Sequence, residues 1–339
     1  MLFYTNNSKA STTLAGVTVT TSGTPGTAGA YTRVVIASDA STNAMSYQCN
    51  NHPNMGGSGT STNTTLTTTH GQTEFGGSII PIVSANKEAG FSIAKYVGNG
   101  TDNSTVPTGL DDVDFAIVKN LDRGTAVANE AASDSQWAVY HKSLSTTQTI
   151  WLNRTDAAKT TVDNYSGGIK KNASNNSLIE LINRTGSSLT WAYSVNINTE
   201  NFILYCWKAI PGYSAFGSYI GNSSTDGPFV YTGFRPAFVM CKAIEIPSAY
   251  QAYYAWTMID NQRPGYNGAD LLPLYANMSK IEGQRAGATT TFSGTNRTID
   301  LLSNGFKVRI GDWGEANASS KSYIYMAWAE APVNFSNAR

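Results

Sequence analysis

The chain contains one strand-like segment twice. Residues 201–211 read NFILYCWKAIP and residues 322–332 read SYIYMAWAEAP. Their aromatic, Ile, Trp and Pro positions coincide without a gap at a separation of 121 residues, as between Trp207 and Trp328. Solenoid repeats have periods of roughly 20–50 residues, whereas a separation of this size matches a whole domain. The sequence therefore predicts that a domain occurs twice.

The similarity continues upstream of both segments. Tyr96, Gly98 and Asn99 correspond to the equally ordered set Tyr219, Gly221 and Asn222 at a separation of 123 residues. Residues 115–119 correspond to 238–242, and residues 137–141 correspond to 256–260. The separation changes by only a few residues, as expected when loops of a shared scaffold gain or lose residues. We place the first copy at 89–211, the second at 212–333 and a short tail at 334–339.

Composition indicates that both copies are β-structures. The chain of 339 residues has 31 Gly, 18 Tyr and 7 Trp, and only 14% of its residues are charged. Aromatic and β-branched residues suit strands, while Gly, Ser and Asn suit tight turns. We predict an all-β fold of two tandem antiparallel β-sandwich domains related by internal duplication. The expected strands are at 79–83, 115–118, 137–140, 149–152, 177–182, 202–207, 229–231, 237–240, 253–256, 299–302, 306–308 and 323–328.

Two local signals complete this prediction. Asn304 and Gly305 lie between two of the expected strands, and Asn-Gly is the strongest short hairpin signal. Residues 126–135 are a candidate for one short helix.

Residues 1–88 match neither copy. Residues 11–30 and 56–73 are Ser, Thr and Gly tracts, and one clear strand is expected at 31–37. Such a region is too poor in apolar residues to bury much core alone. It is either a flexible linker or an extended arm with few strands that becomes ordered on another subunit. The strand at 31–37 and the apolar residues 79–83 favour the arm.

Charge and hydropathy restrict the partners. Positive and negative side chains number 23 each, so no basic surplus exists to bind nucleic acid. No apolar run reaches the ~18 residues of a membrane span, and residues 1–8 do not have the pattern of a secretory signal. Cys49, Cys206 and Cys241 have no metal-type spacing. We expect Cys206 and Cys241 to be small buried residues of a protein made in a reducing cytoplasm.

Few residues are candidates for chemistry. His52 and His70 lie in polar sequence without the further ligands that zinc needs. His141 corresponds to Asp260 in the second copy, so we expect a surface-loop residue. Asp111, Asp112 and Asp114 form either a calcium site or a solvated turn. The turn is favoured because Arg235 and Pro236 stand at the corresponding place in the second copy. No nucleophile elbow or phosphate loop is present, and no cofactor is expected.

Aromatic residues are the remaining candidates. Trp137, Trp151, Trp256 and Trp313 are candidate contacts for a ligand or another subunit. The repeated residues are assigned to the scaffold, where the Gly-Asn pairs mark a turn with an unusual backbone. We expect Tyr96, Tyr219, Trp207 and Trp328 to fill a core or the contact between the copies, with stacking on a ligand as the alternative.

Several segments of both copies resemble a known family. Residues 90–100, 137–142 and 152–158, and in the second copy 221–237 and 302–307, resemble a duplicated β-domain of tailed-bacteriophage structural proteins, notably marine and cyanobacterial ones. The resemblance covers residues 89–333 and leaves residues 1–88 outside. It implies a tail-fibre-like or other virion protein and carries no catalytic residues.

The expected function is therefore structural and non-enzymatic. The resemblance implies a tail-fibre or other appendage subunit on the virion exterior, assembled in the host cytoplasm. Expected partners are further copies of the chain, with a trimer favoured, and other virion proteins that contact residues 1–88. Alternatives are a carbohydrate-binding module for host-surface glycans and a capsid decoration protein. A depolymerase is least favoured because it needs a paired-carboxylate cleft.

Overall fold

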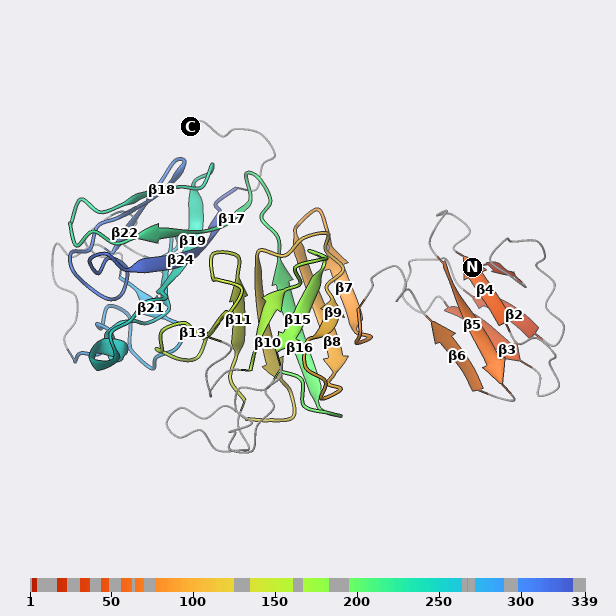
Figure 1. Ribbon diagram of the computed structural model, residues 1–339. Coiled ribbons are helices and arrows are strands. Elements are labelled where there is room, and N and C mark those ends of the chain that lie inside the picture. Colours follow the sequence, from red (N-terminus) through yellow and green to blue (C-terminus); the bar gives the residue numbers. More distant parts are fainter. Residues whose placement is uncertain are drawn as a thin grey trace. The chain divides into compact units, whose positions relative to one another are not determined.

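The chain divides into two compact units, residues 1–76 and 77–339. The computed structural model describes residues 77–124, 135–160, 167–182, 195–263, 267, 272–289 and 298–331, together with the strand paths within residues 2–69 (Figure 1). The expected helix at 126–135, apart from its last residue, lies outside the described residues, as do His52, His70 and Cys49.

The first unit contains more strands than the sequence predicted. Its six strands are β1 (Leu2–Tyr4), β2 (Val17–Ser22), β3 (Tyr31–Ile36), β4 (Ala44–Gln48), β5 (Gly56–Thr62) and β6 (Thr65–Thr69). β1, β4, β5 and β6 form one antiparallel sheet, and β2 pairs with β3. β3 is the strand expected at 31–37. The Thr-rich tract at 56–73 also forms strands, because ladder pairing uses backbone groups and Thr favours the extended conformation.

The second unit confirms the all-β prediction, with four antiparallel sheets. The strands of the first repeat are β7 (Ile82–Asn86), β8 (Phe91–Val97), β9 (Ser104–Pro107), β10 (Phe115–Asn120), β11 (Ala138–His141), β12 (Gln148–Trp151), β13 (Lys159–Thr160), β14 (Gly168–Lys171), β15 (Leu178–Ile182) and β16 (Asn201–Trp207). Those of the second repeat are β17 (Ser214–Ile220), β18 (Phe229–Tyr231), β19 (Pro236–Ala243), β20 (Thr257–Asp260), β21 (Leu274–Tyr275), β22 (Ile299–Leu302), β23 (Gly305–Val308) and β24 (Ser322–Ala329), with a 3₁₀ helix η2 (Ser248–Tyr253).

The two repeats have the same strand order. The large sheet of the first repeat runs β13-β12-β11-β10-β16-β8-β7, and that of the second runs β21-β20-β19-β24-β17. The small sheets run β14-β15-β9 and β22-β23-β18. Register agrees as well, since Phe115 pairs with Trp207 in one repeat and Phe238 pairs with Trp328 in the other. In each repeat a core of buried side chains from both sheets joins the large sheet to the small one, which makes a sandwich.

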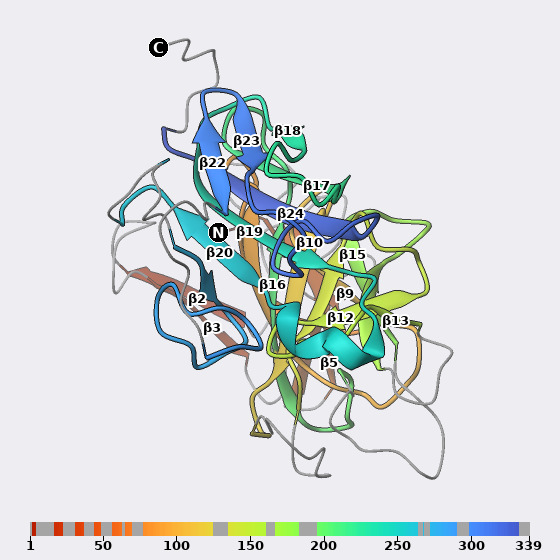
Figure 2. The same ribbon diagram turned by 90° about the vertical axis from the view of Figure 1, so that its left-hand side faces the viewer.

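Burial patterns reveal a second apolar layer. β16 alternates between buried and half-buried residues, as a strand with one buried face does. Every residue of β10 is buried, and β11 and most of β19 and β24 are buried on both faces. Figure 2 looks through the second sandwich onto the first, where β19 and β24 cross β10 and β16 at a steep angle. The large sheets therefore pack against each other.

Two details differ from the predictions, and a third agrees with them. β7 pairs with β8 and Ile79 lies in the first core, so residues 77–88 belong to the first sandwich and not to an arm. The strand expected at 253–256 is instead the end of η2 and a connection, and strand β20 begins at Thr257. The hairpin at Asn304 is present, with Leu302 paired to Gly305.

Candidate functional site: the seam between the sandwiches

The two sandwiches pack against each other through their large sheets, and we call this contact the seam. It is a cluster of buried apolar side chains contributed by both large sheets. The first repeat supplies Phe115, Ile117, Val139, Leu144 and Ile150, and the second supplies Phe216, Met240, Trp256, Ile324 and Met326. Obligate interfaces resemble such a divided core, so the two sandwiches form one block.

Hydrogen bonds fix the alignment of the seam. The Trp256 indole Nε1 donates to the Trp151 carbonyl at 2.8 Å, and the Ala158 amide donates to the Ile244 carbonyl at 2.9 Å. Each bond joins a residue of one repeat to the other. Buried polar groups are costly when unpaired, so these bonds select one arrangement of the two sheets.

His141 also joins the repeats, which makes the expected surface-loop location wrong. The imidazole is fully buried, its Nε2 lies 3.0 Å from the Tyr325 carbonyl, and its Nδ1 accepts the Ser143 amide at 3.1 Å. Since the carbonyl can only accept, we assign the proton to Nε2, and the neutral ring satisfies both partners. Burial lowers the pKa of His141 to about 4. The neutral ring therefore hydrogen-bonds the first repeat to the second across the seam.

Two equivalent lysines are buried in carbonyl cages. Lys119 Nζ donates to carbonyls of its own repeat, including that of Arg123 at 2.9 Å. Lys242 Nζ donates across the seam to the carbonyls of Thr155 at 3.3 Å and Asp156 at 3.1 Å. Burial lowers the pKa of Lys242 to about 7, and the Asp156 carboxylate opposes this shift. The alignment of 115–119 with 238–242 already paired these lysines, but sequence did not indicate their burial.

A continuous series of aromatic rings runs along the seam, and we call it the aromatic strip. Trp207 and Trp328 meet edge to face with centroids 6.4 Å apart. Phe91 and Tyr205 contact Trp207 at 5.1 and 6.4 Å, and Phe238 contacts Trp328 at 5.7 Å. All five residues are half-buried. The structure thus places Trp207 and Trp328 in the contact between the copies, one of the two locations expected for them.

The other candidate tryptophans differ in accessibility. Trp151 lies in the first core and Trp256 in the seam, and both are buried, so neither can stack on an external ligand. Trp137 is half-buried against the seam. Trp313 is exposed, and the Arg285 guanidinium lies 2.9 Å from its ring centroid. The ring face is therefore engaged by a cation within the chain.

The repeated tyrosines have the same role in both sandwiches. Tyr96 stacks on Phe202 and Tyr219 stacks on Tyr323, each with centroids 5.1 Å apart. Their hydroxyls donate to the carbonyls of another equivalent pair, Val195 and Ala316. These are core contacts.

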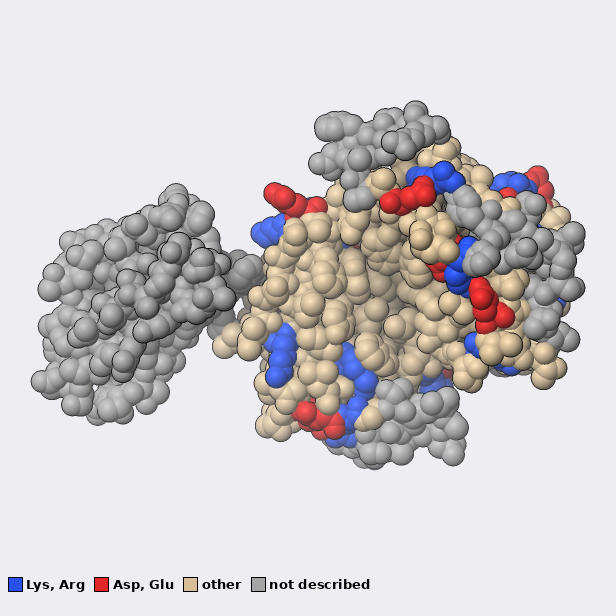
Figure 3. Space-filling view, turned by 180° about the vertical axis from the view of Figure 1, so that it is seen from behind, with Lys and Arg blue, Asp and Glu red and all other residues tan. Residues whose placement is uncertain are grey.

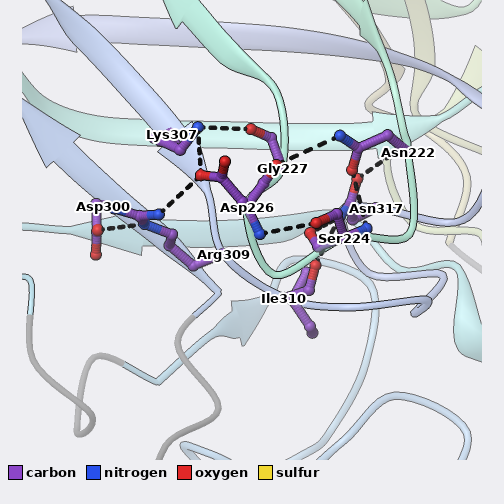
Figure 4. A network of polar contacts seen from close by, with 9 residues as sticks. All are labelled: Asn222, Ser224, Asp226, Gly227, Asp300, Lys307, Arg309, Ile310 and Asn317. Atoms are coloured by element: carbon purple, nitrogen blue, oxygen red, sulfur yellow. Dashed lines mark hydrogen bonds and ion pairs between the residues drawn. The ribbon is translucent and has the colours of Figure 1, made fainter.

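The repeated Gly-Asn turns are closed by a buried asparagine in each repeat. Asn196 Oδ1 accepts the Asn99 amide at 2.8 Å, and Asn317 Oδ1 accepts the Asn222 amide at 2.9 Å. The side-chain amide of each asparagine then donates to the backbone two residues beyond the turn Asn, to Thr101 in the first repeat and to Ser224 in the second. Figure 4 shows Asn317 reaching Asn222, Ser224 and Ile310.

Ion pairs further stabilise the loop that follows the Gly-Asn turn of the second repeat. Asp226 lies 2.9 Å from Lys307 and 3.4 Å from Arg309, and Arg309 Nε lies 2.7 Å from Asp300 (Figure 4). Asp300 belongs to β22, Lys307 belongs to β23, and Arg309 directly follows β23. The loop that carries the family resemblance is therefore fastened to the small sheet.

The acidic cluster does not converge on one point. Asp111 pairs with Lys208 at 2.8 Å, Asp112 pairs with Lys171 at 2.9 Å, and Asp114 pairs with Lys142 at 3.3 Å. Within the described ranges no group of three or more His, Cys, Asp or Glu residues could hold a metal ion. The three carboxylates act as separate ion-pair partners.

Both described cysteines are buried thiols, as expected. Burial raises the pKa of Cys241 to about 12 and also raises the pKa of Cys206. Neither is a thiolate near neutral pH.

One face of residues 77–339 has few charged side chains. In Figure 3 the Lys, Arg, Asp and Glu residues lie around the rim of this face, while its middle is uncharged and hollowed. Among the described residues, no helix is long and apolar enough to cross a membrane.

Comparison with known proteins gives a family. The model of a domain of unknown function, DUF7483, matches residues 5–332. No curated protein and no solved structure matches the chain. The match extends over most of the first unit and over both sandwiches. The chain therefore belongs to the DUF7483 family.

Proposed function

We propose that the chain is a non-enzymatic structural subunit on the exterior of a phage virion, either a tail-fibre or another appendage subunit. The observation that carries the proposal is the seam, in which the two sandwiches share one buried apolar cluster. A block of this kind suits a part that must hold its shape while it presents surfaces for assembly or host contact. The resemblance of residues 89–333 to phage structural proteins supports the same function.

The division of the chain supports a role for each part. Residues 1–76 form one compact unit and residues 77–339 another. In our proposal the first unit docks on the particle and the double sandwich faces outward. The boundary moves from residue 88 to residue 76, because β7 belongs to the first sandwich.

The candidate groups for chemistry that lie among the described residues have structural partners, which supports the non-enzymatic part of the proposal. His141 bonds to a carbonyl across the seam, and the three clustered aspartates each pair with a lysine. General acid or base chemistry needs a group that can reach a substrate proton. The hydrogen bond and ion pairs of these groups stabilise the fold instead.

The test is the location of the chain on purified particles. Antibodies raised against the double sandwich should label the exterior in immunogold electron microscopy, and peptides of the chain should occur in the particle proteome. A chain without residues 1–76 should fold but fail to join particles. Absence of the chain from purified particles contradicts the proposal. Labelling over the capsid instead of the tail favours the decoration protein.

A carbohydrate-binding module is the second candidate, favoured by the aromatic strip. Its half-buried rings offer apolar faces of the kind that pack on sugar rings. A glycan array that detects binding, and a Trp328→Phe variant that weakens it, would support this function. A matched Tyr231→Phe change, at a 68% exposed ring on β18, should leave binding unchanged. No binding by the folded chain excludes it.

A further inference from the structure

The two large sheets differ at one edge. In the first repeat β7 covers the outer edge of β8, in register from Ile82 opposite Lys95 to Asn86 opposite Phe91. In the second repeat the equivalent strand β17 is the outermost strand of its sheet within the described chain. Among the described strands, this edge of the scaffold is therefore covered in the first repeat and uncovered in the second.

The groups that face outward from β17 follow from its ladder with β24. The Ala329 amide donates to the Tyr213 carbonyl at 2.8 Å, and the Gly221 amide donates to the Lys321 carbonyl at 2.9 Å. Odd-numbered residues of β17 therefore bond to β24, because backbone groups alternate in direction along a strand. The amides and carbonyls of Phe216, Ser218 and Ile220 point to the outer edge.

The first repeat shows what such groups bind. The Lys208 amide donates to the Gly90 carbonyl at 2.8 Å and the Gly98 amide donates to the Glu200 carbonyl at 2.9 Å, so even-numbered residues of β8 bond to β16. Ile93 and Lys95 consequently face β7. Their counterparts at a separation of 123 residues are Phe216 and Ser218. The outward groups of β17 are thus equivalent to groups that bind an antiparallel strand in β8.

The edge of β17 has no protection against pairing. Its sequence is SAFGSYI, without a charged residue or a proline. Natural edge strands are commonly blocked by Lys, Pro or a bulge because a bare edge recruits another strand. Ser218 is exposed and Ile220 is 65% exposed, so the end of this edge is open to solvent.

We propose that the β17 edge pairs antiparallel with the β17 edge of a second copy of this chain, which joins two five-stranded sheets into one. A two-fold contact of this kind satisfies both bare edges at once. The outer edge of β7 is the competing occupant, but β7 has 5 residues and β17 has 7. Pairing of β7 with β17 is also head-to-tail and leaves one edge of each kind free unless a ring closes.

This inference goes beyond the proposed function and applies to the isolated chain, whether or not it belongs to a particle. It also replaces the trimer favoured from sequence with a two-fold pair.

The test uses the full chain in analytical ultracentrifugation at micromolar concentration, with Ser218→Pro as the variant. Proline removes the outward amide of residue 218 and leaves the ladder with β24 intact, and edge strands tolerate it. The wild type should sediment as a dimer. The variant should sediment as a monomer with an unchanged circular dichroism spectrum.

The matched control is Ala85→Pro, which removes an outward amide from the outer edge of β7. Ala85 is exposed, and by the alternation described above its amide points away from β8. This variant should remain a dimer. A monomeric wild type, a dimeric Ser218→Pro chain, or dissociation by Ala85→Pro would each overturn the proposal, the last in favour of head-to-tail pairing.

Hydrogen exchange tests the edge without a substitution, which matters if Ser218→Pro fails to fold. The amides of Phe216, Ser218 and Ile220 should be protected at concentrations where the wild type is a dimer and exchange rapidly on dilution to the monomer. Protection that persists in the monomer would mean that another part of the same chain covers the edge, and the proposal would be wrong.

Discussion

Gly98 and Gly221 are the clearest case in which the repeat predicts a constraint on single residues. A Cβ atom at Gly221 would collide with the Ala318 carbonyl oxygen and lie 2.9 Å from the Asn317 carbonyl carbon. At Gly98 it would collide with the Ile197 carbonyl in the same manner. Sequence predicted a turn with an unusual backbone at both positions, but this was wrong, because neither glycine has a positive φ. The reason for glycine, a close approach of backbone, required the structure.

We expect Gly221→Ala to destabilise the chain by about 1–3 kcal/mol or more, because backbone must move to accommodate the methyl group. Gly311→Ala is the control, since its Cβ would have no neighbour closer than 3.7 Å. Denaturant unfolding measures both. Equal stability of the two variants would show that the close approach at Gly221 is not restrictive.

His141 gives a prediction of pH dependence. Its pKa is lowered from 6.5 to about 4 in the folded chain, so the unfolded chain binds a proton first as the pH falls. The stability that the neutral ring contributes is complete above pH 6.5 and is lost as the pH falls toward 4, by about 3 kcal/mol in total.

The measurement is the free energy of unfolding between pH 7 and 4 for the wild type and a His141→Gln variant. The variant should have a smaller loss over this interval, and the difference isolates His141 from the nearby Lys142 and Asp114. Parallel pH profiles for the two proteins would contradict burial of a neutral ring.

At the scale of elements, sequence located most strands because their apolar runs are short and bounded by turns. Residues 229–231 and 299–302 coincide with β18 and β22. The strand predicted at 253–256 was wrong. This run of Tyr, Ala and Trp is as apolar as a buried strand, but it forms the end of η2 and the connection that follows it. Periodicity over four residues cannot separate these cases.

A substitution at Trp256, which directly precedes β20, tests the hydrogen bond between this residue and the first repeat. Trp256→Phe keeps an aromatic ring but removes the indole donor to the Trp151 carbonyl. An unpartnered buried carbonyl costs about 1–3 kcal/mol, and the smaller ring adds to this loss. Trp137→Phe, at the equivalent half-buried position, should cost less. Thermal unfolding of both variants makes the comparison, and equal shifts would contradict the role of this bond.

At the scale of the whole molecule, sequence found the two copies but not their contact. The seam residues come from segments that are far apart in the sequence, and no local pattern pairs Phe115 with Phe216. One signal was available. The run at 115–118 is apolar at every position, as in strands that are buried on both faces. It indicates a second covered face without identifying what covers it.

The central claim is that the seam makes the two sandwiches one block. Ile324 and Ile169 are both fully buried, the first in the seam and the second only in the first core. Either change to Ala should cost about 2–5 kcal/mol. Only the loss of Ile324 should weaken the coupling between repeats.

The most direct test is native-state hydrogen exchange of the full chain in denaturant, read separately for β10 and β16 and for β19 and β24. The account predicts one common opening free energy for the four strands in the wild type, and separate values for the two repeats in Ile324→Ala but not in Ile169→Ala. Two separate opening free energies in the wild type, with Ile324→Ala affecting the second repeat alone, would contradict it.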